Sequence, residues 1–224
     1  MSKEYHLNMP ITEEQARELR LGDVVYLSGK VVTLRDMTHG RAVEIIRKGE
    51  DVPFDLKNSA IWHCAPIVKK DDSGKWHITA AGSTTSSRFT YTGSELVKKY
   101  KTRITFGKGT MWQEAVDVMK EVGSCYLNTT GGTAALYAQK VEEVENVFWL
   151  ELGLPESAWC LRVKDLGPFI VGIDAHGNSL YANIRKEMNK RLIEQCKKYN
   201  VKLDYTYAYL PLDITGKARQ IPAC

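Results

Sequence analysis

Several kinds of segment are missing from this sequence of 224 residues, and each absence excludes a class of protein. No apolar run approaches the ~20 residues that a membrane-spanning helix needs. The first six residues lack the apolar core of a secretion signal. No run of lysine or arginine is longer than two, and the net charge is only +4, a pattern that does not indicate nucleic-acid binding. We therefore expect a cytoplasmic protein that binds neither membranes nor nucleic acid.

Cysteine is scarce, and common cofactor motifs are missing. The five cysteines are an odd number and include no Cys-x-x-Cys pair, so neither a disulfide framework nor a local zinc site follows. The sequence also lacks the Gly-x-Gly-x-x-Gly fingerprint and the Walker spacing of nucleotide-binding loops. We therefore expect buried thiols that behave as small apolar side chains, and no metal ligands in this chain.

The remaining sequence predicts an α/β domain. With 43% apolar residues, the chain can bury a core. Strand-like and helix-like runs alternate after residue 101, which predicts a parallel or mixed sheet whose loops share one edge. We expect strands at 23–28, 30–34, 60–65, 76–81, 102–106, 124–127, 144–150, 158–163 and 169–174, and helices at 12–20, 94–100, 110–122, 134–140 and 179–199.

The stretch Ala81–Arg88, Ala-Gly-Ser-Thr-Thr-Ser-Ser-Arg, joins a strand-like run to a helix-like run. Backbone N–H groups at a helix start, several hydroxyls and one guanidinium favour binding of a carboxylate or phosphate. A polar turn that only caps the following helix explains these residues equally well. The rest of the chain has to decide between the two interpretations.

Two further cations stand where strands end. Arg35 follows one strand, although an Arg35/Asp36 surface pair explains it as well, and Lys108 lies between two glycines at a strand-to-helix turn. Together with Arg88 they indicate a multiply charged anion, such as a small dicarboxylate. Among these cations only Arg35 has a carboxylate beside it in the sequence.

Two histidines have plainer explanations than catalysis. His63 lies inside an apolar, strand-like run, where a buried core histidine is the favoured interpretation. His176 lies between Asp174 and Asn178, two residues that commonly fold a turn and cap a helix. No nucleophile with an adjacent base follows from the sequence, so the residues alone give an incomplete active site.

A family resemblance adds to this reading. The sequence resembles the β subunit, or C-terminal domain, of the iron–sulfur hydro-lyases, a group that contains class I fumarases and L(+)-tartrate dehydratase. The resemblance covers about residues 12–185. The motifs that carry it occur in one order: Arg35–His39, Pro53–Leu56, Gly82–Arg88, Gly107–Gly109 and Ile173–Asn178. Two other segments look closest to the tartrate dehydratase β subunit: His63–Lys70 and Glu151–Ser157.

The resemblance implies a fold, a partner and a reaction. The implied fold is a swivelling β/β/α domain with a mixed sheet, which we expect at residues 1–200, with residues 201–224 as an extension that could bind a partner. The implied partner is an α subunit whose own cysteines hold a [4Fe–4S] cluster, in an α2β2 or similar hetero-oligomer. The implied reaction is reversible addition or removal of water on a C4 dicarboxylic acid, either L-tartrate to oxaloacetate or fumarate/malate.

The resemblance also implies roles for individual residues. Arg35, Arg88 and Lys108 would bind the substrate carboxylates and stabilise the charge that develops when the adjacent proton is removed. Thr84 would be the base, which requires neighbouring cations to lower the pKa of its hydroxyl.

The chain departs from the family pattern at two positions of these loops. The family has proline where this chain has Ser83, and a further glycine where it has Thr110. These departures leave open an alternative, a non-catalytic dicarboxylate-binding or scaffold subunit with the same fold.

Overall fold

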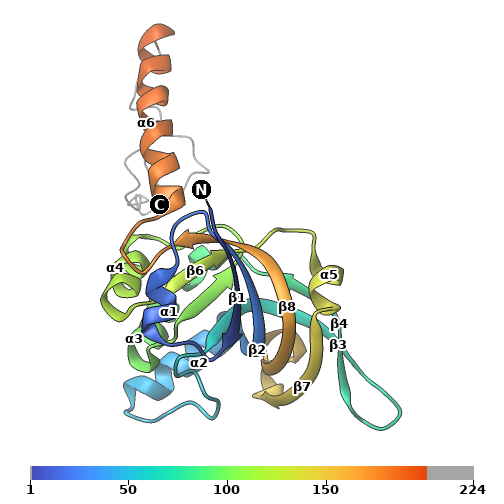
Figure 1. Cartoon of the computed structure of the whole chain (residues 1–224). Coiled ribbons are helices and arrows are strands. Elements are labelled where there is room, and N and C mark those ends of the chain that lie inside the picture. The colour runs from blue at the N-terminus through green and yellow to red at the C-terminus, as the bar shows by residue number, and fades with distance from the viewer. Residues whose placement is uncertain (1, 201–224) are drawn as a thin grey trace, which may run out of the picture. The chain divides into compact units, whose positions relative to one another are not determined.

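The computed structural model describes residues 2–200 (Figure 1). The predicted Tyr-rich extension at 201–224 lies outside the described residues. In chain order the elements are β1 (Glu4–Met9), α1 (Glu13–Glu18), β2 (Val24–Leu34), α2 (Asp36–Arg47), β3 (Ala60–Lys70), β4 (Trp76–Ser83), the 3₁₀ turn η1 (Ser86–Phe89), α3 (Thr90–Tyr100), β5 (Ile104–Gly107), α4 (Gln113–Val122), β6 (Cys125–Asn128), α5 (Ala134–Ala138), β7 (Val141–Phe148), η2 (Leu150–Leu152), η3 (Leu154–Glu156), β8 (Ala158–Ile173) and α6 (Leu180–Lys198).

The described strands form one mixed sheet, as the sequence predicted. Strands β2, β3, β5 and β6 are neighbours and run parallel, while β8 runs antiparallel to β6. Because β8 also pairs along β2, the hydrogen bonding closes the ring β2–β3–β5–β6–β8–β2. β1 pairs with β2, β7 with β8, and β4 with the second half of β3. The prediction of an α/β fold with a mixed sheet is confirmed.

Two long strands correct the predicted element boundaries. The runs expected at 23–28 and 30–34 are one strand, β2, and the runs expected at 158–163 and 169–174 are one 16-residue strand, β8. Each was divided at glycine or proline, residues that usually interrupt a strand. Here β2 and β8 pair from Val24↔Ile170 to Thr33↔Trp159, and register shifts absorb the irregular residues.

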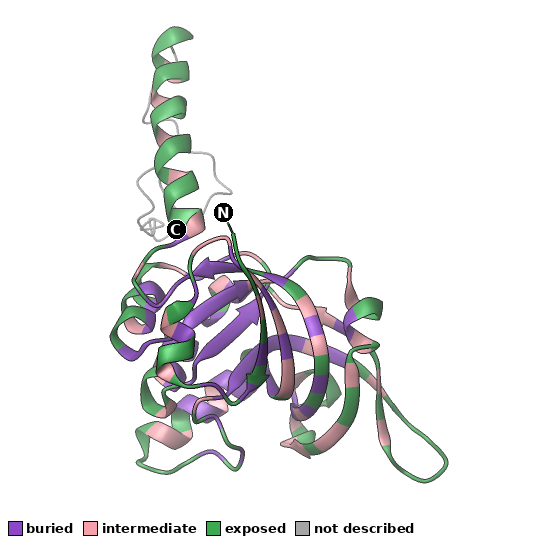
Figure 2. Cartoon of the chain, in the orientation of Figure 1, coloured by how far each residue is buried: buried purple, intermediate pink, exposed green. Residues whose placement is uncertain are grey.

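Helices cover the ring and complete three apolar clusters. The first cluster lies among the strands and includes Leu27, Trp62, Phe106, Trp159 and Phe169. The second packs α2 and α3 against β2 and β3, and the third packs α4 against β6 and the end of β8. Every residue of β5 is buried, whereas the tip of the β3–β4 hairpin is exposed (Figure 2). The buried core therefore supports the carboxyl ends of the parallel strands.

The chain divides into two units, residues 1–179 and 180–224. Within the second unit the structure describes α6, and none of its residues is buried. A capping box opens α1, where the Thr12 hydroxyl accepts from the Gln15 N–H. No helix among the described residues is long and apolar enough to cross a membrane.

Candidate active site

The candidate site lies where the parallel strands end. Strand register places the ends of β2, β5 and β6, at Leu34, Gly107 and Asn128, at a similar level, so the residues that follow these strands meet at one edge. Arg35 directly follows β2, and Lys108 directly follows β5. The shared edge that the alternating pattern predicted is therefore present.

The Thr84–Ser86 segment enters this edge because β3 changes its neighbour. β3 pairs with β5 only from Ala60 to Trp62, and from Cys64 onward it pairs with β4. The space beside Lys108 is filled by the chain that leaves β4, where Thr85 forms a parallel bridge with Lys108. The sequence predicted this loop between a strand and a helix. It did not predict that β3 and β5 separate there, because that separation depends on tertiary pairing.

The backbone of Thr84 is held on both sides. Its N–H donates to the carbonyl of His63 (2.7 Å), and its carbonyl accepts from the N–H of Lys108 (3.1 Å). The N–H of Ser86 donates in turn to the carbonyl of Lys108 (3.0 Å). These bonds fix the backbone of Thr84. The Thr84 hydroxyl itself makes no hydrogen bond within residues 2–200.

Arg35 and Arg88 meet on one carboxylate. Arg88 Nη2 lies 3.0 Å from Asp36 Oδ2, and Arg35 Nε lies 3.5 Å from the same oxygen. Arg35 Nε also lies 3.2 Å from Glu156 Oε1, and Glu156 Oε2 accepts from the N–H of Met37 (2.9 Å). Asp36 therefore connects the end of β2 to the η1 turn, and the two guanidinium groups that the sequence predicted as site residues lie together.

The two carboxylates change the charge balance that the sequence suggested. Asp36 and Glu156 pair with the two arginines, so the three predicted cations and these two carboxylates carry a net charge of +1 if all five groups are ionised. The Arg88 and Asp36 side chains are 45% and 43% exposed, and ion pairs as exposed as this one contribute little stability. An incoming carboxylate can therefore replace Asp36 on Arg88 at small cost. The amine of Lys108 makes no ion pair within the described residues.

A buried histidine fixes the geometry between the two arginines. The His39 Nδ1–H donates to the carbonyl of Arg35 (2.8 Å), and the ring stacks on Phe89 with centroids 4.4 Å apart. Phe89 directly follows Arg88, whose guanidinium carbon lies 5.4 Å from the Phe89 ring centroid. The motif Arg35–His39 carried part of the family resemblance in the sequence. That His39 is a packing contact between two loops follows only from the structure.

Burial of His39 predicts a loss of stability in acid. Burial is the main cause that lowers the pKa of His39 to about 4, and it also lowers the pKa of the buried His63. The unfolded chain takes up these protons near pH 6.5, whereas the folded chain resists them. The contribution of neutral His39 to the free energy of unfolding is therefore complete above pH 6.5 and is lost as the pH falls toward 4. For His39 alone the loss amounts to about 3 kcal/mol, which urea unfolding between pH 7.5 and 4.5 measures.

A His39→Phe variant is the matched control, because phenylalanine keeps the stacked ring and does not titrate. The backbone N–H of residue 39 already donates to the carbonyl of Arg35 (2.9 Å), so that carbonyl keeps a partner. We expect a flatter pH dependence of the unfolding free energy in His39→Phe than in the unchanged chain. Identical pH dependence in the two proteins would contradict a neutral His39.

Both departures from the family pattern have local partners. The Ser83 hydroxyl accepts from the indole N–H of the buried Trp62 (2.9 Å), and the Thr110 hydroxyl donates to the carbonyl of Met111 (3.1 Å). His176 lies in the turn that was predicted for it, where Asp174 Oδ1 accepts from its N–H and from that of Asn178, both at 3.0 Å. These residues therefore have structural roles in the fold.

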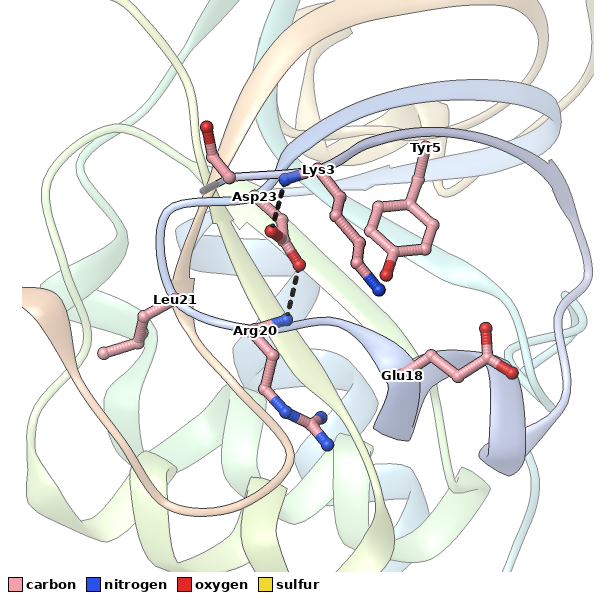
Figure 3. A pocket seen from close by; sticks show the side chains of 7 residues that line it. Lys3, Tyr5, Glu18, Arg20, Leu21 and Asp23 are labelled. Carbon is pink, nitrogen blue, oxygen red and sulfur yellow. Dashed lines mark hydrogen bonds between the residues drawn. The ribbon is translucent and has the colours of Figure 1, made fainter.

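A hollow of about 380 Å³ lies away from the candidate residues (Figure 3). It is lined by residues that precede β1 and by residues of β1, α1 and the turn between α1 and β2: Ser2, Lys3, Tyr5, Glu18, Arg20, Leu21 and Asp23. The Asp23 carboxylate at its edge is already occupied, because it accepts from the N–H groups of Lys3 (2.8 Å) and Arg20 (2.9 Å). None of the four predicted site residues lines this hollow.

The thiols of Cys64, Cys125 and Cys160 lie on different strands, and burial favours their protonated form. Burial raises the pKa of Cys125 to about 12 and that of Cys160 to about 11, and it also raises the pKa of Cys64. These three lie on the different strands β6, β8 and β3. Within residues 2–200, no three His, Cys, Asp or Glu side chains are grouped as metal ligands.

Comparison with known proteins gives the family. A model of the family described as "Fumarase C-terminus" matches residues 1–184. The chain belongs to the Fumarase C-terminus family. Among its relatives, "L(+)-tartrate dehydratase subunit beta" of Escherichia coli K12 is 40% identical over 83% of this chain and 90% of the relative. "Putative L(+)-tartrate dehydratase subunit beta" of Methanocaldococcus jannaschii is 40% identical over 85% and 97%.

Another Fumarase C-terminus relative is a longer protein. "Putative fumarate hydratase class I" of Geobacillus stearothermophilus is 44% identical over 83% of this chain, and the chain spans 35% of its length. The matches confirm the resemblance to β subunits and C-terminal domains of hydro-lyases that the sequence motifs indicated. The proteins of these names are carbon–oxygen lyases that add or remove water.

Proposed function

We propose that this chain is the β subunit of a hydro-lyase that reversibly adds or removes water on a C4 dicarboxylic acid. Its substrate would be L-tartrate, which gives oxaloacetate, or the pair fumarate and malate. The observation that supports this most directly is the meeting of Arg88 and Arg35 on Asp36, next to the bridge that joins Thr85 to Lys108. Charge-assisted contacts from three cations suit a small diacid.

In this proposal each residue of the edge has one task. Arg88 and Lys108 bind the substrate carboxylates, with Arg35 beside them, and they stabilise the negative charge that builds up as the proton leaves. Thr84 takes that proton on its side-chain oxygen, and the two backbone hydrogen bonds at residue 84 fix the backbone that carries this side chain. Lowering of the pKa of this hydroxyl by the adjacent cations is part of the proposal.

An α subunit would complete the site and hold the [4Fe–4S] cluster through its own cysteines. The buried and separated thiols of this chain fit that division, because none of Cys64, Cys125 and Cys160 is a thiolate near the edge. When bound, such a cluster supplies Lewis-acid chemistry at the substrate hydroxyl and carboxylate.

Exposed apolar side chains next to the edge suit a docked subunit. Met37 on the first turn of α2 is 51% exposed, Tyr91 on the first turn of α3 is 65% exposed, and Leu154 in η3 is 40% exposed. Each lies within three residues of Asp36, Arg88 or Glu156. We infer that the α subunit covers this rim in a hetero-oligomer such as α2β2.

Reconstitution tests the proposal. The chain would be co-expressed without oxygen with the α subunit encoded in the same genome, and the cluster checked by its visible absorption. We expect the complex to convert L-tartrate to oxaloacetate or to interconvert fumarate and malate, and each subunit alone to be inactive. A complex with an intact cluster that binds a diacid but converts none of these substrates would favour the scaffold alternative.

Substitution of Arg88 by lysine tests the two-pronged contact. The lysine keeps the charge but loses the planar fork, so we expect KM for the diacid to rise about 10–100-fold. Steady-state kinetics of the complex measure this change. Arg47→Lys is the matched control, because Arg47 is an exposed arginine paired with Glu95 at the other end of α2. An unchanged KM and kcat in Arg88→Lys would exclude Arg88 from substrate binding.

A further inference from the structure

A buried chain of hydrogen bonds lies beneath the candidate edge. His63 Nδ1 lies 2.8 Å from Ser86 Oγ, Ser86 Oγ lies 2.9 Å from Tyr126 Oη, and Tyr126 Oη lies 2.7 Å from the carbonyl of Gly107. All three side chains are 0% exposed. We name this set the His63 array. It joins β3, η1, β6 and the end of β5, which are the elements that hold Thr84 and Lys108.

The chemistry of the groups gives the array one direction. The Tyr126 hydroxyl lies 2.7 Å from the carbonyl of Gly107 and 3.2 Å from that of Gly109, and carbonyls can only accept, so its one proton goes to the nearer of the two, Gly107. The Tyr126 oxygen then accepts from the Ser86 hydroxyl, and the Ser86 oxygen accepts from an N–H at His63 Nδ1. Every donor of the chain is thereby used, and each bond polarises the next.

The other nitrogen of His63 supports the same direction. His63 Nε2 is buried and has no hydrogen-bonding partner within the described residues. A proton on that nitrogen would be a buried donor without an acceptor, which proteins rarely contain, whereas an unpaired acceptor costs less. The neutral imidazole with its proton on Nδ1 therefore fits the site. Protonation of both nitrogens is disfavoured by burial, which holds the pKa of His63 well below its usual value.

The array packs closely against Gly107 and the Thr84 turn. A β-carbon added at Gly107 would be 2.3 Å from Ser86 Oγ and 3.0 Å from the carbonyl oxygen of Thr84. The carbonyl of Gly107 also accepts from the N–H of Thr129 (2.9 Å), so this acceptor is itself fixed. No side chain therefore fits at residue 107 between β5 and the Thr84 turn.

We propose that His63, Ser86 and Tyr126 are positioning residues, which set the Thr84 turn against Lys108 through an Nδ1-protonated His63. This inference rests on the proposed function for the consequence of that positioning, catalysis by Thr84. None of the three touches the reacting atoms in this proposal. Their effect is to hold Thr84 and the cation-bearing loops at a fixed separation.

The tautomer of His63 tests the array without catalysis. Two-bond ¹H–¹⁵N correlation spectra of the full chain report which nitrogen carries the proton, and loss of a signal in His63→Asn assigns it. We expect Nδ1–H in the unchanged chain. In Tyr126→Phe the Ser86 hydroxyl loses its acceptor, so its hydrogen bond with His63 changes and the ¹⁵N signal of His63 Nδ1 should shift. Nε2–H in the unchanged chain, or an unshifted Nδ1 signal in Tyr126→Phe, would overturn the proposal.

Tyr137→Phe is the matched control, because Tyr137 is a buried core tyrosine whose hydroxyl accepts from the N–H of Thr130 (3.2 Å). We expect the His63 tautomer to stay unchanged in this variant. The backbone amide signals of Thr84 and Lys108 should shift in Tyr126→Phe and stay in place in Tyr137→Phe. Equal shifts in the two variants would contradict a specific link between the array and the turn.

Kinetics of the reconstituted complex separate this inference from the proposed function. We expect Ser86→Ala and Tyr126→Phe each to lower kcat about 10-fold or more with a smaller change in KM, and the double variant to be no worse than the more severe single one. His63→Asn, which keeps a donor near the Nδ1 position, should retain more activity than His63→Leu. Normal kcat in these variants would overturn the positioning role of the array and leave the proposed hydro-lyase function intact. An inactive complex of the unchanged chain would overturn the proposed function, and the tautomer of His63 would still test the array.

Discussion

In the complex with an α subunit, Thr84→Ala is expected to lower kcat about 10²–10⁴-fold, the range for loss of a general base. Complex formation should not change, because residue 84 is held by its backbone N–H and carbonyl, which alanine keeps. Removal of the hydroxyl therefore removes the proposed proton acceptor and leaves the turn in place. Steady-state turnover of the diacid, with the amount of complex measured by gel filtration, tests this expectation.

The neighbouring threonine is the matched control for Thr84. Thr85 is exposed and meets Lys108 through its backbone, so Thr85→Ala removes a hydroxyl of the same kind one residue away. We expect Thr85→Ala to stay within a few-fold of the unchanged enzyme. Thr84→Ser should recover most of the lost turnover, since serine restores the hydroxyl. Normal kcat in Thr84→Ala would remove Thr84 from the mechanism.

The chemical demand on Thr84 is severe, and the surrounding charges determine whether it can be met. A free hydroxyl is far too weak a base near neutral pH, so nearby positive charge has to stabilise its deprotonated form. In this chain alone Asp36 and Glu156 partly neutralise the arginines. Displacement of Asp36 from Arg88 by the α subunit would make the field at Thr84 more positive, whereas the diacid itself brings negative charge to the same cations.

The sequence predicted the class of the fold, but it did not predict that the sheet closes into a ring through the pairing of β2 with β8. Alternating strand and helix patterns after residue 101 gave the parallel neighbours β5 and β6 because such units pack in only a few ways. The pairing of β2 with β8 could not be foreseen. It joins residues more than 120 positions apart through irregular strands, with Gly29 and Gly167 at points where local rules predict a break.

The candidate site was predictable where it depended on strand ends. Arg35 and Lys108 follow strands in the sequence, and that placement alone predicted a common edge. The charge balance was not predictable, since Glu156 reaches Arg35 from a 3₁₀ turn far along the chain, and Asp36 bonds to an arginine on another element. His63 was correctly expected to be buried, but its partner Ser86 lies 23 residues away and is identified only by tertiary contact.

Gly107→Ala is expected to lower kcat about 10²-fold, although the change adds a single methyl group that takes no part in the proposed chemistry. The added β-carbon would meet Ser86 Oγ at 2.3 Å and both His63 Cβ and the Thr84 carbonyl oxygen at 3.0 Å. Because the neighbouring atoms belong to the backbone and to fully buried side chains, the turn has to move away from β5. We also expect a loss of about 1–3 kcal/mol in unfolding free energy, the usual cost of overpacking.

Gly82→Ala is the matched control, since a β-carbon there would meet only Ala134 Cβ at 3.5 Å, an ordinary contact. Turnover and thermal midpoint of this variant should stay close to those of the unchanged protein. A second substitution separates packing from positioning. Ser86→Ala combined with Gly107→Ala removes the closest clash, so it should recover part of the thermal midpoint but not kcat, because the His63 array is still broken. Recovery of kcat together with stability would show that the Thr84 turn needs only space and no hydrogen-bonded support.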